Sequence, residues 1–203
     1  MAITALVLAM LTALAGVPPG PVQTTPTPPV DAAGAARPGI KPIPDVEVRD
    51  QDGRKLRFVS DLLKNRTVVV SFFYTRCKGI CPITGRALAR LQAALSAAGR
   101  NDVYILSLSK DPEVDTPRRL KAWGKRLGVK PGWLLLTGEK QKMDELLLTL
   151  SGDPAQRGEH SDALLILDLD RGVWIRDAAF LDPEHYLQIV DDIGRRTRVM
   201  GRL

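Results

Sequence analysis

The sequence predicts a layered α/β domain in which helices flank a central mixed sheet, with a hairpin at its N-terminal end. Apolar runs rich in β-branched residues, such as 67–73 and 103–109, alternate with segments whose apolar residues recur at helical spacing. Asp52-Gly53 is a strong hairpin turn signal. The only two cysteines of the chain follow the first long apolar run. Because α/β sheets place their sites at the carboxyl ends of central strands, these observations also predict where the chemistry lies.

The two ends of the chain are predicted to lie outside this domain. Residues 1–17 are uncharged and almost wholly apolar, and Ala13-Leu14-Ala15 resembles a cleavage site, so the segment is interpreted as a signal peptide or membrane anchor. Residues 18–44 are rich in proline and form an extended tether. The folded domain is predicted at 45–196, with a basic tail at 197–203. Export would place this domain in the periplasm or another extracytoplasmic compartment, where the N-terminal segment could hold it at the inner membrane.

The first half of the domain begins with the hairpin, whose residues alternate in polarity around the turn. Ser60 or Asp61 can cap a short helix after it. A buried strand leads into the cysteine loop, and the amphipathic helix beyond that loop ends at Gly99. In chain order we predict strands at 45–48, 55–59 and 67–73, a helix at 83–98 and a strand at 103–109.

Helix caps and turn residues indicate where the helices and strands begin and end in the second half of the domain. Asp115 or Thr116 is the N-cap of a helix that has Pro117 in its first turn. Asp170-Arg171-Gly172 turns the chain between the last two strands, and Asp182-Pro183 starts the final helix. We predict a helix at 117–127, a strand at 133–137, a helix at 140–150, strands at 163–168 and 173–175, and a helix from 183 to near 194.

The net charge of +6 allows an acidic partner or a membrane surface. Basic residues recur between 118 and 126 and again in the tail at 195–198. Export and the lack of interleaved aromatic residues argue against nucleic acid. A solvated surface is the first interpretation, and weak attraction to an anionic membrane or an acidic partner is the second.

Cys77 and Cys81 put two soft sulfur atoms at one point between a strand and a helix. Such a pair can hold a thiophilic metal, exchange a disulfide, or do both. Because thiols oxidise outside the cytoplasm, a plain structural disulfide is the simplest alternative. A domain of roughly 150 residues does not need one, and a bond closing so small a loop would constrain the unfolded chain little.

Histidine supplies the candidate third ligand. His160 lies in a polar loop before the strand at 163–168, and in a layered domain that loop can reach the cysteine loop. His185, inside the last helix, is interpreted as an ordinary polar residue. Two thiolates and one imidazole suit Cu(I) and can accept Cu(II), whereas structural zinc normally needs four protein ligands. Arg76, Lys78 and the N-terminus of the following helix would favour the thiolate forms.

Four blocks carry a family resemblance, and they are residues 72–82, 111–117, 133–138 and 160–168. In this order they resemble the Sco/SenC family of copper-binding, thioredoxin-fold assembly factors of cytochrome c oxidase. The resemblance covers most of residues 45–194, and it implies a thioredoxin-like fold with copper bound by Cys77, Cys81 and His160. Lys78-Gly79 stands where many members have Pro-Asp, which exchanges an acid for a base beside the predicted site.

We therefore interpret the chain as a copper chaperone, not an enzyme, that takes copper from a donor and delivers it to a respiratory oxidase subunit. A disulfide cannot supply two thiolates, so an external thiol reductant is an implied partner. Two alternatives stay open: a thiol–disulfide oxidoreductase that reduces the copper-ligand cysteines of an oxidase subunit, and a thiol or copper redox sensor. Asp111 and Asp115 resemble a metal or catalytic pair, but the sequence favours a structural role in the loop and the helix cap.

Overall fold

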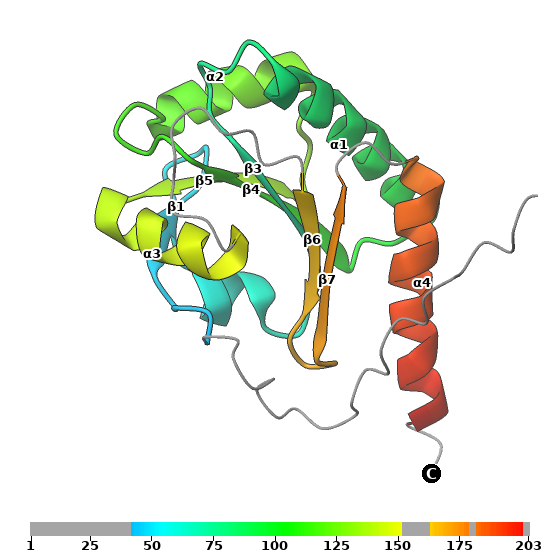
Figure 1. Cartoon of the computed structure of the whole chain (residues 1–203). Coiled ribbons are helices and arrows are strands. Elements are labelled where there is room, and N and C mark those ends of the chain that lie inside the picture. Colours follow the sequence, from blue (N-terminus) through cyan, green and yellow to red (C-terminus); the bar gives the residue numbers. More distant parts are fainter. Residues whose placement is uncertain (1–41, 152–162, 179–181, 201–203) are drawn as a thin grey trace, which may run out of the picture.

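The computed structural model describes residues 42–151, 163–178 and 182–200, which form a seven-stranded sheet with helices on both faces (Figure 1). The strands are β1 (Glu47–Arg49), β2 (Lys55–Arg57), β3 (Thr67–Phe73), β4 (Val103–Ser109), β5 (Trp133–Gly138), β6 (Ala163–Asp168) and β7 (Val173–Ala178). The helices are η1 (Phe58–Leu63), which is a short π-helix, α1 (Ile80–Ala97), α2 (Pro117–Leu127), α3 (Lys140–Ser151) and α4 (Pro183–Met200). No helix in the described residues is both long and apolar enough to cross a membrane.

Several predictions concern residues outside this range. They are the signal peptide or anchor at 1–17, most of the tether at 18–44, the loop that carries His160, and the last three residues of the tail. What the sequence indicates for these residues therefore stays a prediction.

The sheet has the order β2-β1-β5-β4-β3-β6-β7. β3 runs parallel to β4, and β4 runs parallel to β5. β6 pairs antiparallel with the other side of β3, with Leu165 opposite Val70, and β7 continues the sheet as an antiparallel neighbour. The β1–β2 hairpin joins the opposite side through antiparallel pairing of β1 with β5. The sheet is therefore mixed and begins with a hairpin, which confirms the predicted fold class.

Two apolar layers hold the helices against the sheet (Figure 1). On one face, Leu88 of α1, Leu120 of α2 and Tyr186 of α4 belong to the same buried cluster as Val69 and Phe73 of β3. On the other face, α3 and η1 pack against the alternate residues of the same strands. Because both faces are covered, every residue of β3 is buried. The cysteine loop therefore begins at the end of a fixed central strand.

The start of α1 differs from the prediction. The helix begins at Ile80 rather than Ile83, with Gly79 as its N-cap. Pro82 occupies the third helical position, where the N–H group that proline lacks would have no intrahelical partner. Cys81 consequently lies in the first turn of the helix, and only Cys77 lies in the loop.

The start of η1 and the end of α4 also differ. The Asp45 carboxylate accepts hydrogen bonds from the N–H groups of Val59 and Ser60, at 2.8 and 3.1 Å, so the start of the short helix is capped by a residue that lies just before β1. Neither Ser60 nor Asp61 is its N-cap. The last helix continues through Gly194 to Met200. A glycine inside a helix costs only about 1 kcal/mol, which the packing of α4 on α1 can offset.

Candidate metal centre

The two cysteines lie at the carboxyl-terminal end of β3. Cys77 follows a tight turn in which its N–H group donates to the Tyr74 carbonyl at 3.1 Å. Cys81 lies one helical turn further along, in α1. Both side chains are buried, at 6% and 5% exposure, and no disulfide joins them in the structure. A soft metal requires the pair in its reduced form.

The surroundings of the two thiols separate their pKa values. Burial opposes ionisation of Cys77, but hydrogen bonds from the Cys81 thiol, from the N–H groups of Cys81 and Gly79 and from the Tyr74 hydroxyl together lower its pKa. Burial, and then the hydrogen bond with Cys77, raise the pKa of Cys81 to about 12. The structure thus favours one thiolate, Cys77, supported by N–H groups at the N-terminus of α1.

Tyr74 completes this cluster and was missed by the sequence reasoning. Its pKa is raised by burial and then by its hydrogen bond with Cys77, so the phenol stays neutral and donates to the sulfur. Tyr74 directly follows the end of β3, within the same sequence block as the cysteines. An aromatic hydroxyl three positions before a cysteine was the available signal.

Asp115 anchors the cysteine loop. Its side chain is fully buried and accepts hydrogen bonds from the Thr75 N–H group at 3.1 Å, from the Thr75 hydroxyl, and from the Ser109 hydroxyl at 2.6 Å. Thr75 lies two residues before Cys77, so this carboxylate ties the loop after β3 to the loop after β4. Of the two predicted cap residues, Thr116 is the N-cap of α2, accepting from the Arg119 N–H group at 3.4 Å. Asp115 has a structural role as expected, but it ties two loops instead of capping the helix.

The second aspartate of this block has a different partner. Asp111 forms an ion pair with Arg76 at 2.7 Å, which adds a second tie between the same two loops. Arg76 was expected to stabilise the thiolates, but its charge is engaged by Asp111, and hydrogen bonds account for the lowered pKa of Cys77. Lys78 is exposed. The two aspartates therefore hold separate partners and do not form a metal pair.

The described residues include only one of the two histidines, His185. His185 is exposed on α4, where its Nε2 atom lies 2.9 Å from a carboxylate oxygen of Asp177, which agrees with its interpretation as an ordinary polar residue. His160 lies outside the described residues, so its role as third ligand stays a prediction. Within the described part of the chain, no group of three or more His, Cys, Asp or Glu side chains could hold a metal ion.

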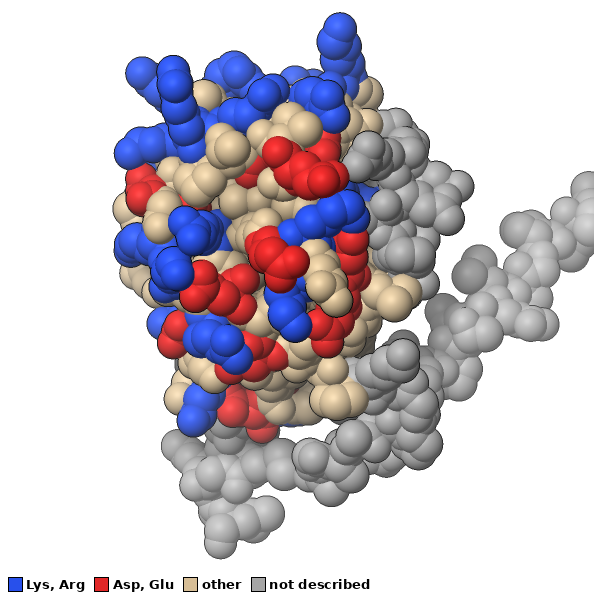
Figure 2. Space-filling model, turned by 90° about the vertical axis from the view of Figure 1, so that its left-hand side faces the viewer, with Lys and Arg blue, Asp and Glu red and all other residues tan. Residues whose placement is uncertain are grey.

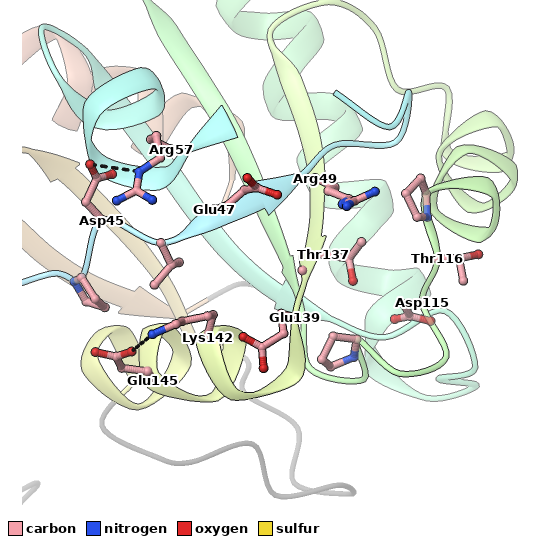
Figure 3. A pocket seen from close by; sticks show the side chains of 15 residues that line it. Asp45, Glu47, Arg49, Arg57, Asp115, Thr116, Thr137, Glu139, Lys142 and Glu145 are labelled. Atoms are coloured by element: carbon pink, nitrogen blue, oxygen red, sulfur yellow. Dashed lines mark ion pairs between the residues drawn. The ribbon is translucent and has the colours of Figure 1, made fainter. Parts of the chain in front are cut away.

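A separate cavity of about 710 Å³ lies between β1, the end of β5, the start of α3 and the loop before α2 (Figure 3). Neither cysteine lines it. Charges of both signs line it, and some already pair with each other, as Arg57 does with Asp45 and Lys142 with Glu145 (Figure 3). Carboxylates and cations without sulfur are poor ligands for a soft metal, so the cysteine pair remains the candidate centre.

A mixed sheet whose central strand ends in a dithiol, one sulfur in the loop and one in the first turn of the next helix, defines a thioredoxin-like protein. The SCO1/SenC family model matches residues 43–167. The chain belongs to this family, which confirms the resemblance found in the sequence.

Known relatives agree with this assignment. The chain is 35% identical to the SCO1 protein homolog of Bacillus subtilis over 94 residues, which are 46% of this chain and 47% of that protein. The chain spans about half the length of the curated relatives that it matches first.

Two solved structures show the same fold. BsSco, described as a member of the Sco family of cytochrome c oxidase assembly proteins, superposes with a TM-score of 0.62 at 25% identity, covering 75% of this chain and 91% of BsSco. Yeast Sco1 with copper bound gives a TM-score of 0.60 at 21% identity, covering 76% of this chain and 94% of the yeast chain. At that identity the yeast likeness concerns the fold alone.

Proposed function

We propose that this chain is an extracytoplasmic copper chaperone that delivers copper to a respiratory oxidase subunit. Its cargo site would consist of Cys77, Cys81 and His160. The observation that carries the proposal is the placement of the two cysteines, one in a loop and the other at the N-terminus of α1, in a protein of the SCO1/SenC family. A relative from Stutzerimonas stutzeri, 31% identical over 109 residues and described as a putative copper-binding protein, supports the choice of cargo. BsSco, described as a member of a family of oxidase assembly proteins, supports the destination.

The position of β6 supports His160 as the third ligand. β6 begins at Ala163 and runs antiparallel to β3, with Leu165 opposite Val70. Its first residue therefore lies beside the carboxyl-terminal half of β3, toward the end that carries the cysteine loop. His160 precedes Ala163 by three residues, which span at most about 10 Å when extended. This short span before β6 is why we propose His160, rather than His185, as the third ligand.

The two thiols would hold and release copper by ligand exchange. Cys81 lies in the first turn of a helix, whereas Cys77 lies in a loop. That loop is fixed by the hydrogen bonds of Thr75 with Asp115 and by the ion pair of Arg76 with Asp111. Incoming thiolates of an acceptor can replace the two sulfurs one at a time, so that copper never leaves its ligands. The copper donor supplies the metal, and an external thiol reductant keeps the pair reduced where disulfides form readily.

One observation favours a second candidate function, that of a thiol–disulfide oxidoreductase. A thiol of lowered pKa beside a thiol of raised pKa is the pairing of an attacking and a resolving cysteine. In that case Cys77 would attack a disulfide between the copper-ligand cysteines of an oxidase subunit, and Cys81 would release the reduced subunit. A thiol or copper redox sensor is the third candidate and has no separate structural support.

Metal analysis of the reduced protein tests the proposal. One copper per chain is expected, and Cys77→Ser, Cys81→Ser and His160→Ala should each lose most of the affinity. His185→Ala is the matched control, because it removes the other histidine of the chain. Equal losses from the two histidine variants would refute the ligand assignment. Rapid catalytic reduction of generic protein disulfides, without copper transfer to a dithiol acceptor, would favour the oxidoreductase instead.

A further inference from the structure

Two neighbouring helices carry a set of exposed cations that have no acidic partner. The side chains of these residues form no ion pair or hydrogen bond within the described part of the chain. We call this set the basic surface, and it consists of Arg86 and Arg90 in α1, Arg118, Arg119, Lys125 and Arg126 in α2, and Lys130 just after α2.

Close packing makes these cations part of one surface. A Cβ atom on Gly85 of α1 would come within 2.6 Å of the Leu127 side chain at the end of α2, so the two helices approach closely at this point. The Gln92 side chain of α1 also bonds the Lys130 N–H and carbonyl groups, at 3.1 and 2.9 Å. Figure 2 shows lysine and arginine side chains gathered along the upper edge of the molecule, over which α1 and α2 run in Figure 1.

Several other exposed lysines of the protein have acidic partners. On α3, Lys140 pairs with Asp144 and Lys142 with Glu145. In the hairpin, Lys55 pairs with Glu47 at 3.1 Å. On α2 itself, only Lys121 has an ion pair among the described residues, with Asp52 at 2.9 Å. Unpaired cations such as Arg49, Lys64 and Lys78 also occur elsewhere in the described part of the chain, but the basic surface gathers seven of them on two neighbouring helices and the residues that follow. This clustered charge creates a field that attracts an anionic partner.

An apolar residue near the cysteines indicates what kind of partner this is. Ile83 is 46% exposed in the first turns of α1, two residues after Cys81 and on the same helical stripe as Arg86 and Arg90. An apolar spot rimmed by charge is the anatomy of a protein interface. A membrane-binding helix instead turns an apolar stripe outward, whereas α2 buries Leu120 and Trp123 in the core.

We propose that the basic surface, with Ile83 at its end nearest the cysteines, docks the acidic face of a partner protein and so orients that partner over Cys77 and Cys81. The orientation over the cysteines rests on the proposed copper delivery, whereas the acidic docking does not. Complementary charge acts chiefly on the encounter rate, which it raises by about 10- to 1000-fold at low salt.

The test uses the reduced, copper-free full chain and a fluorescent acidic peptide that contains aspartate, glutamate and one leucine but no cysteine. Arg86→Glu/Arg90→Glu and Arg118→Glu/Arg126→Glu should each weaken binding at least about tenfold. Lys140→Glu/Lys142→Glu is the matched control, because it changes the net charge by the same amount on α3 and should bind like the unaltered chain. Ile83→Ser should weaken binding several-fold without changing its salt dependence. Circular dichroism checks that each variant is folded.

Binding should also fall steeply between about 0.01 M and 1 M salt, over which the screening length shortens from about 30 Å to about 3 Å. Equal effects of the α1 and α3 charge reversals would overturn the proposal. So would tighter binding, at equal negative charge, to vesicles of phosphatidylcholine and phosphatidylglycerol than to the peptide. Copper binding is measured separately on the same variants. If the unaltered chain binds no copper but its peptide binding depends on the basic surface, only the proposed function has failed. If the unaltered chain binds copper but its peptide binding is insensitive to the α1 and α2 charge reversals, only the docking proposal has failed.

Discussion

Replacing Asp115 with alanine should destabilise the protein more than any change to the exposed charges around it. The carboxylate is fully buried and is the shared acceptor for the Thr75 N–H group, the Thr75 hydroxyl and the Ser109 hydroxyl. Asp115→Ala would leave these three donors without their acceptor, and the Ser109 hydroxyl among them is fully buried. The perturbation therefore acts on the contact that fixes the cysteine loop.

The magnitude follows from opposing contributions. Each hydrogen bond to a charged group contributes about 1.5–3 kcal/mol, so the three bonds amount to several kcal/mol. Removing the carboxylate also recovers part of the several kcal/mol that its own burial costs. We expect a net loss of about 3 kcal/mol in the free energy of unfolding. Asp115→Asn keeps one acceptor oxygen and should lose about 1 kcal/mol.

Urea unfolding followed by tryptophan fluorescence measures this loss, since Trp123 stacks on Phe73 at the base of the loop with ring centroids 4.4 Å apart. Asp111→Ala is the control, because its partner Arg76 is more than half exposed and the pair should contribute about 1 kcal/mol or less. A Thr75→Val change combined with Asp115→Ala should show coupling of at least about 0.5 kcal/mol. A loss below about 1 kcal/mol for Asp115→Ala, or one equal to that of Asp111→Ala, would refute the reasoning.

Other predictions concern pH, the core and redox state. Hydrogen bonds, led by that of the Ser60 hydroxyl, lower the pKa of Asp45 to about 2, so its contribution to stability is present above about pH 4 and is lost as the pH falls through 2. Asp45→Asn should cost about 1 kcal/mol at neutral pH, after allowance for solvent screening, and should flatten the acid limb of the stability profile measured by urea unfolding. Ser107→Ala should cost about 2 kcal/mol in the same assay, because two buried groups lose their hydrogen-bond partner. These are the Ser71 hydroxyl and the Trp133 indole N–H group, which lie 2.7 and 2.9 Å from the Ser107 hydroxyl. No loss would mean that both groups find other partners. The oxidised protein should stay folded but bind copper poorly in anaerobic titrations, and reduction should restore binding; equal affinity in both states would remove the cysteines from the site.

Local signals predicted much of this fold. The bounds of β3 and β4 agree with the apolar runs because a strand buried on both faces is a continuous apolar segment. Thr116 was recognised as a cap because its partner, the Arg119 N–H group, lies three residues away. The cysteine pair was located because its two members are neighbours in sequence.

Contacts between distant residues were beyond the reach of such signals. Asp45 caps η1 from fourteen positions before Val59, and nothing in the local sequence distinguishes it from other surface aspartates. Asp111 and Asp115 look alike in sequence, yet one pairs with an exposed arginine and the other is a buried acceptor. The sheet decides between these roles by bringing the loops after β3 and β4 together.

The tie between Thr75 and Asp115 has a consequence for the order of folding. These residues are 40 positions apart, so the tie forms only after α1, β4 and the loop beyond β4 are in place. The two sulfur atoms, in contrast, are close as soon as the first turn of α1 has formed. We therefore expect a newly made chain to pass through a stage in which the two thiols are close together but still exposed to oxidants. Oxidation at this stage would occur before the native loop exists, so the proposed external reductant would be needed during maturation as well as during copper delivery.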